Sequence, residues 1–308
     1  MTVSFSDNRV ITTLKYSKYR VKPTIVNGEA VQNKRVPYVV SIKVINRRVE
    51  YDKWLWLNLC GGSIISDYKV LTAAHCFESN KFYFVNHPKF LRIVAGCEKT
   101  DIVHSGKTET TDEGQWRKIE RVVLNKNFLF PYNDIALVFV DEKWRFNQFV
   151  NYITPAVRSA DYPDTCYSAG YGKLSDKFFE IDAPYLLLAR IRVLPRWQCS
   201  VLWEMNMNKF ICTDSTLGDV AKGDSGGPLA CRGITNVGQE RDEVLVGIVS
   251  GKNFDKTTLY TRVSAYHDWI LSDCCTTQMA PPMLIVILIK VLLLIYLLIL
   301  LYFLFCGA

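Results

Sequence analysis

Hydrophobic and polar positions alternate along this chain in short runs. From Val39 onward, runs rich in Val, Ile, Leu or Tyr recur about every ten residues, and each ends at Gly, Asn, Asp or Pro. This pattern predicts an all-β domain, either a barrel or a sandwich. The expected strands are residues 39–44, 70–72, 92–95, 119–124, 135–140, 186–193, 244–250 and 259–263.

Two segments near the C-terminal end have a different pattern. Ser264–Leu271 is typical of a short amphipathic helix with Ser264 as its N-cap. Residues 283–306 are almost wholly apolar, and Lys290 is their only charge. As a helix this segment is about 35 Å long, enough to cross the hydrocarbon core of a bilayer. We therefore predict a transmembrane helix at 283–306, after a linker at 274–282.

The apolar tail has two interpretations. It is a single spanning helix in which Lys290 extends toward the headgroups, or it is a removable signal for a glycolipid anchor. The chain ends at Ala308 without basic residues after the tail, which favours the anchor signal. A short spacer and two cysteines within residues 272–277 favour the spanning helix. Both interpretations predict an extracellular domain held at a membrane.

The composition narrows the class of protein. The chain has 37 Lys and Arg against 30 Asp and Glu, and its net charge of +7 is spread along the sequence, which does not indicate a nucleic-acid partner. Ten cysteines without a C-x-x-C pair, and only four histidines, favour disulfides over a zinc site. Residues 1–24 form a polar leader without the apolar run of a secretory signal. Either the N-terminus is incomplete, which we favour, or export uses another signal.

Three motifs carry the chemistry. They are Leu-Thr-Ala-Ala-His-Cys at 71–76, Asn-Asp-Ile-Ala-Leu at 133–137 and Gly-Asp-Ser-Gly-Gly-Pro-Leu at 223–229. Together, and in this order, they resemble the chymotrypsin/trypsin-like serine peptidase family over residues 25–273. The resemblance implies two six-stranded antiparallel β-barrels, a short C-terminal helix and an active site in the cleft between the barrels.

The resemblance assigns a catalytic triad to His75, Asp134 and Ser225. A serine hydroxyl is a poor nucleophile at neutral pH, so it needs an adjacent base, which is His75 here. Asp134 fixes the tautomer of His75 and stabilises the imidazolium. The backbone N–H groups of Gly223 and Ser225 are expected to form the oxyanion hole.

Further roles follow from the same resemblance. Ser250 matches the serine that supports the triad aspartate. The implied disulfides are Cys60–Cys76, Cys166–Cys231 and Cys199–Cys212, which leaves Cys97, Cys274, Cys275 and Cys306 as a spare bridge or buried thiols, with lipidation of the membrane-proximal pair as the minority interpretation.

Activation departs from the family pattern. Ile25-Val26-Asn27-Gly28 resembles the N-terminus that zymogens of the family expose on cleavage, and the freed Ile25 ammonium is expected to pair with Asp224. The family usually has Arg or Lys before the isoleucine, whereas this chain has Thr24. An unusual activating protease and a permanently inactive zymogen therefore both remain open.

The residues that determine substrate specificity in the family also differ in this chain. Asp219 stands where trypsin-like members have the carboxylate that binds Arg or Lys of the substrate. Gly251-Lys252 replaces the family's Trp-Gly, and Thr257-Thr258 replaces its Pro-Gly. Lys252 or Lys222 is positioned in sequence to neutralise Asp219. Preferences for basic and for small P1 residues therefore both remain open, P1 being the substrate residue before the cleaved bond.

Two functions from different classes compete. The first is a serine endopeptidase that acts on proteins or peptides, binds protease inhibitors and needs neither a metal nor an organic cofactor. The second is a catalytically silent, protease-like binding module tethered to the membrane, and Thr24 and the altered pocket are its best support. The intact set of three triad residues favours the enzyme. A structural membrane protein without protease ancestry is the least favoured of the hypotheses.

Overall fold

A computed structural model describes residues 28–111, 114–162, 165–173, 183–232, 243–252 and 257–276. The chain divides into a unit at 1–265, which contains all strands of the described residues, and a second unit at 266–308. Thr24, Ile25 and the predicted tail at 283–306 lie outside the described residues. In the part of the chain that the structure describes, no helix is both long and apolar enough to cross a membrane.

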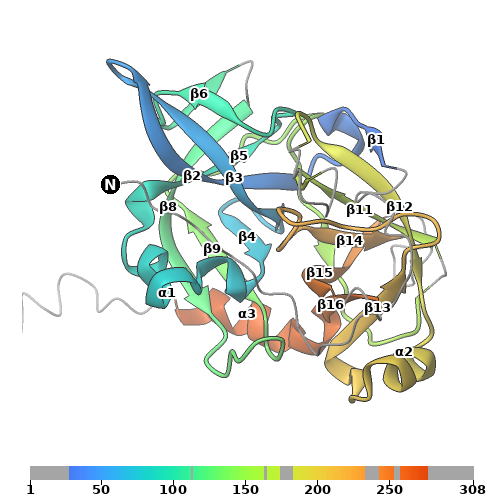
Figure 1. Cartoon of the computed structure of the whole chain (residues 1–308). Coiled ribbons are helices and arrows are strands. Elements are labelled where there is room, and N and C mark those ends of the chain that lie inside the picture. Colours follow the sequence, from blue (N-terminus) through green and yellow to red (C-terminus); the bar gives the residue numbers. More distant parts are fainter. Residues whose placement is uncertain are drawn as a thin grey trace, which may run out of the picture. The chain divides into compact units, whose positions relative to one another are not determined.

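Two β-sheets form the larger unit (Figure 1). The strands of the first sheet are β2 (Val39–Glu50), β3 (Lys53–Ile64), β4 (Lys69–Thr72), β5 (Leu91–Ala95), β6 (Ile102–His104), β7 (Glu109–Thr111), β8 (Gly114–Leu124) and β9 (Ala136–Val140). Those of the second are β1 (Glu29–Ala30), β10 (Thr154–Pro155), β11 (Thr165–Gly170), β12 (Leu187–Val193), β13 (Phe210–Asp214), β14 (Pro228–Cys231), β15 (Val244–Lys252) and β16 (Thr258–Arg262).

Six strands of each sheet close into a ring. The order β2-β5-β8-β9-β4-β3 closes because β2 also pairs with β3, and the order β12-β11-β14-β15-β16-β13 closes because β12 also pairs with β13. These rings are antiparallel and agree with the predicted pair of six-stranded barrels. Two details differ from the prediction: each sheet gains two strands of two or three residues, and one of these, β10, pairs with β15 in parallel.

The helices of the described residues are short and lie between or after strands in the sequence. They are α1 (Ser79–Asn86), α2 (Arg196–Trp203), α3 (His267–Thr276) and the 3-10 turns η1 (Asn33–Arg35), η2 (Ala74–Phe77), η3 (Pro88–Phe90), η4 (Met207–Lys209) and η5 (Val263–Tyr266). The predicted C-terminal helix is present, but it begins as a 3-10 turn at Val263 rather than with a cap at Ser264.

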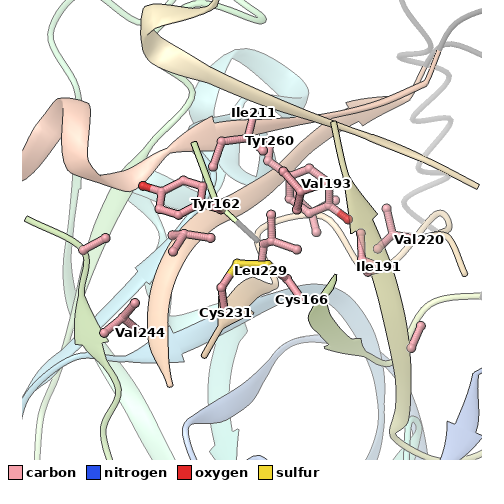
Figure 2. Packing of buried hydrophobic residues seen from close by; sticks show 14 of the residues in the cluster. Tyr162, Cys166, Ile191, Val193, Ile211, Val220, Leu229, Cys231, Val244 and Tyr260 are labelled. Carbon is pink, nitrogen blue, oxygen red and sulfur yellow. A yellow bond between two sulfur atoms is a disulfide. The ribbon is translucent and has the colours of Figure 1, made fainter. Parts of the chain in front are cut away.

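Apolar side chains from several strands fill the second ring (Figure 2). Leu229 and Tyr260 are fully buried there beside the Cys166–Cys231 disulfide. Burial of such side chains is the main contribution to stability, at about 1.5–3 kcal/mol for each large one. The packed interior gives a rigid support for the loops that leave the strand ends.

Candidate active site

His75 and Asp134 are held together by two contacts. Nδ1 of His75 lies 2.7 Å from Oδ2 of Asp134, and the backbone N–H of His75 donates to Oδ1 over 2.9 Å. His75 is 7% exposed and Asp134 is 0% exposed. Because a carboxylate only accepts hydrogen bonds, Nδ1 carries the proton and Nε2 is the basic ring nitrogen.

The first barrel brings these two residues together. His75 lies in η2 directly after β4, and Asp134 precedes β9, whose Ala136 pairs with Thr72 of β4. Asn133 has a φ of 55°, a left-handed conformation that Asn tolerates. Its side chain donates to the carbonyl of Asn127 over 2.7 Å. This turn directs Asp134 toward His75.

The second barrel supports Asp134 from two adjacent strands. The Ser250 hydroxyl donates to Oδ2 over 2.6 Å, and the Thr261 hydroxyl donates to the backbone carbonyl of Asp134 over 2.8 Å. On the first barrel, the ring of Phe130 lies edge-on to His75 with centroids 5.6 Å apart. The histidine and the carboxylate are therefore fixed from several sides.

Ser225 lies in a turn that contacts both barrels. Its carbonyl accepts from Gly61 of β3 over 2.8 Å, and the next residue, Gly226, donates to Val249 of β15 over 2.9 Å. Gly226 has a φ of 77°, and a Cβ there would come within 3.1 Å of the backbone nitrogen of Ala73. The turn therefore packs against the residues that lead into His75, which brings the three sequence motifs to one place.

Gly223, the first predicted oxyanion donor, is anchored by a residue that sequence reasoning missed. Its φ is 97°, and its carbonyl accepts from Nδ2 of Asn58 over 3.0 Å. The Ser41 hydroxyl in turn donates to Oδ1 of Asn58 over 2.7 Å. No local sequence signal reveals Asn58, because 165 residues separate the two partners.

Asp224 is fully buried next to this turn. Gly172 donates to its Oδ1 over 2.7 Å and Ala221 donates to its Oδ2 over 2.8 Å. Burial raises the pKa of Asp224 to about 7, although these two N–H groups act in the opposite direction. Its expected partner, Ile25, lies outside the described residues.

Asp219 is buried and bound by the chain itself. The ammonium of Lys252 lies 2.9 Å from its Oδ2, and the Thr258 hydroxyl donates to its Oδ1 over 2.6 Å. Lys222, the alternative neutralising residue, has an exposed side chain. Lys252, one of the two lysines considered from the sequence, therefore pairs with Asp219.

The three expected disulfides are present. Cys60–Cys76 joins β3 to the turn that carries His75, and Cys199–Cys212 joins α2 to β13. Sγ atoms of Cys60 and Cys76 lie near His75, but they are bonded to each other and are not thiolate ligands for a metal. Cys97 is buried, and the side chains of Cys274, Cys275 and Cys306 lie outside the described residues.

Comparison with known proteins agrees with this geometry. The family model described as Trypsin matches residues 25–270. Chymotrypsin-C of Rattus norvegicus is 28% identical over 261 residues, which cover 80% of this chain and 87% of that protein. Tissue-type plasminogen activator of Bos taurus is 32% identical over 260 residues, which cover 76% of this chain but only 41% of that longer protein.

Proposed function

Because the chain belongs to the trypsin family of serine proteases, we propose that it is a serine endopeptidase with Ser225 as its nucleophile. The observation that supports this most is the buried carboxylate of Asp134, which contacts both the ring and the backbone of His75. An aspartate at this position orients the imidazole and stabilises its protonated form.

The proposed reaction has two stages. In the first, Oγ of Ser225 attacks the carbonyl carbon of the peptide bond while Nε2 of His75 accepts the hydroxyl proton. The protonated His75 then gives this proton to the leaving amine as the C–N bond breaks, which leaves an acyl-enzyme. In the second stage, a water attacks the ester, His75 accepts a proton from it, and the proton returns to Ser225.

The negative charge that develops on the substrate oxygen needs donors fixed in advance. The N–H groups of Gly223 and Ser225 are proposed to supply them, and each such donor is typically worth about 10²–10³ in rate. The positive φ of Gly223 supports this role. Glycine adopts such a φ readily, whereas a residue with a Cβ does not, so glycine suits the tight turn that presents these N–H groups. Asn58 contributes by holding the carbonyl of the same residue.

Activation is proposed to involve Asp224. Burial raises the pKa of this carboxylate because it destabilises the charged form. An ammonium that binds beside the carboxylate stabilises that charged form. The freed N-terminus of Ile25 is the proposed cation, so the chain before cleavage is a zymogen. Thr24 in place of a basic residue means that the activating protease has a specificity unlike that of trypsin.

The domain is proposed to work outside the cell at a membrane surface. Three disulfides support an oxidising compartment, and the apolar segment at 283–306 supports a membrane tether. Release of the protein from cells by a phospholipase C specific for glycolipid anchors would identify the anchor. Retention after that treatment, together with resistance to alkaline carbonate extraction, would identify the spanning helix.

The function is tested by active-site labelling. The full chain is made with an enteropeptidase recognition sequence in place of residues 20–24, so that cleavage frees Ile25, and it is then exposed to a fluorophosphonate. Covalent labelling of the cleaved chain, but not of a cleaved Ser225→Ala variant, is expected. If a folded, cleaved sample takes no label, the binding module becomes the better interpretation.

A further inference from the structure

The carboxylate of Asp219 already has the contacts that a basic ligand would offer. Oδ2 lies 2.9 Å from the ammonium of Lys252. Oδ1 accepts from the Thr258 hydroxyl over 2.6 Å and from the backbone N–H of Val220 over 2.9 Å. The side chains of Asp219 and Lys252 are 5% and 20% exposed, so this ion pair is largely shielded from water.

The end of β15 brings Lys252 to this carboxylate. Lys252 pairs with Thr258 across β15 and β16, and both residues bind Asp219. Ser250, two positions earlier on β15, binds Asp134. One strand therefore carries a contact to the triad carboxylate and a contact to the pocket carboxylate. The family's glycine at the position of Lys252 has no side chain that could fill this role.

A basic P1 side chain has two ways to reach Asp219, and both are unfavourable. It can displace Lys252, which exchanges one ion pair for another and leaves a poorly hydrated ammonium behind. Alternatively it can bind beside Lys252, which brings two like charges together around one carboxylate. A small uncharged P1 side chain requires neither change and leaves the ion pair intact.

We propose that Lys252 is a specificity-determining residue that occupies the base of the pocket and excludes arginine and lysine at P1. The substrates are then proteins or peptides with a small uncharged P1 residue. This inference rests on the proposed endopeptidase function, since it concerns the substrate pocket of the same site.

Ligand binding tests the inference without requiring catalysis. The probes are benzamidine, which carries a planar cation, and benzoate, its anionic counterpart, measured by calorimetry on the full cleaved chain carrying Ser225→Ala. In that background, the Lys252→Ala variant is expected to bind benzamidine about 10- to 100-fold more tightly. This change in affinity corresponds to the free energy that one charge-assisted hydrogen bond usually contributes. Lys222→Ala removes the same charge from an exposed neighbouring site and is expected to leave both affinities unchanged.

A reciprocal variant covers the case in which Lys252→Ala does not fold. Asp219→Asn leaves the ammonium of Lys252 without its carboxylate, so benzoate is expected to bind about tenfold more tightly or better. A peptide library cleaved by the chain with an intact Ser225 should shift in parallel, from small uncharged P1 residues to basic ones in Lys252→Ala.

The outcomes separate the two proposals. The role of Lys252 would be overturned if the parent chain bound benzamidine as tightly as the Lys252→Ala variant does. It would also be overturned if both variants folded and their affinities for benzamidine and benzoate equalled those of the parent chain. Failure of the endopeptidase proposal would look different, because fluorophosphonate labelling would be absent while the probe affinities still shifted as expected.

Discussion

The Ser250 hydroxyl lies 2.6 Å from Oδ2 of Asp134, and this hydrogen bond joins the two barrels at the proposed triad. Ser250 belongs to β15 of the second sheet, whereas Asp134 precedes β9 of the first. Both residues are buried. The position of the carboxylate that orients His75 therefore depends on how one barrel packs against the other.

Ser250→Ala is expected to lower kcat about tenfold, because a hydrogen bond to a charged acceptor is worth about 1.5–3 kcal/mol. KM should change little, since Ser250 acts through Asp134. Steady-state kinetics on the cleaved chain measure both constants. Ser63→Ala is the matched control, because its buried hydroxyl has no hydrogen-bond partner among the described residues. An equal loss of kcat in the two variants would contradict this role.

Asp134→Asn tests the tautomer of His75 more directly. The amide would be able to donate toward Nδ1, which would shift the ring proton to Nε2 and abolish its basicity toward Ser225. The rate of fluorophosphonate labelling is expected to fall by about 10⁴. The fold should persist, because Thr261 binds the backbone carbonyl of this residue rather than its side chain. Labelling at an unchanged rate would exclude Asp134 from the triad.

The prediction of the candidate site rests on motifs with fixed spacing. His75, Asp134 and Ser225 each lie within a short, recognisable stretch. The pairing of β4 with β9 brings the first two stretches together, and the close approach of Gly226 to Ala73 brings the third to them. The sequence also predicted most of the strands that are buried along their length, such as β9, in which all five residues are buried.

Other features depend on long-range packing and were not predictable. The strand predicted at 39–44 continues to Glu50, and its second half pairs with β3 in a hairpin (Figure 1). This second half is mostly exposed and polar, so it lacks the hydrophobic pattern by which strands were predicted. The ion pair between Lys252 and Asp219 joins residues that belong to no common sequence motif, so only the folded chain reveals it. Asn58 contacts Gly223 across 165 positions, so only the folded chain reveals it.

Asn58→Ala is expected to lower kcat about fivefold to tenfold at constant KM, because one neutral hydrogen bond contributes about 1 kcal/mol. The loss should appear in kcat since the bond holds the carbonyl of Gly223 beside the proposed oxyanion hole. Asn147→Ala removes a comparable side-chain contact to the backbone, at Phe149 and Val150, and serves as the control. A change confined to thermal stability would limit Asn58 to a structural role.

The free energy of unfolding of the uncleaved chain is expected to fall as the pH rises from about 4 to about 7. Burial raises the pKa of Asp224 to about 7, whereas an aspartate in an unfolded chain has a pKa of about 3.9. Between these values the unfolded chain has lost the proton that the folded chain still holds, so rising pH favours unfolding. The resulting loss in the free energy of unfolding is on the order of a few kcal/mol, and it reaches its full size above the pKa of Asp224 in the folded chain.

Urea unfolding of the parent chain and of Asp224→Asn, at several pH values in this window, measures that contribution. The amide does not titrate, so the difference between the two pH profiles belongs to Asp224. After cleavage before Ile25, the new ammonium is expected to lower the pKa of Asp224 and flatten the profile of the parent chain. If the profiles of the parent and variant chains coincide before cleavage, Asp224 keeps an ordinary pKa and the proposed driving force for insertion of Ile25 is absent.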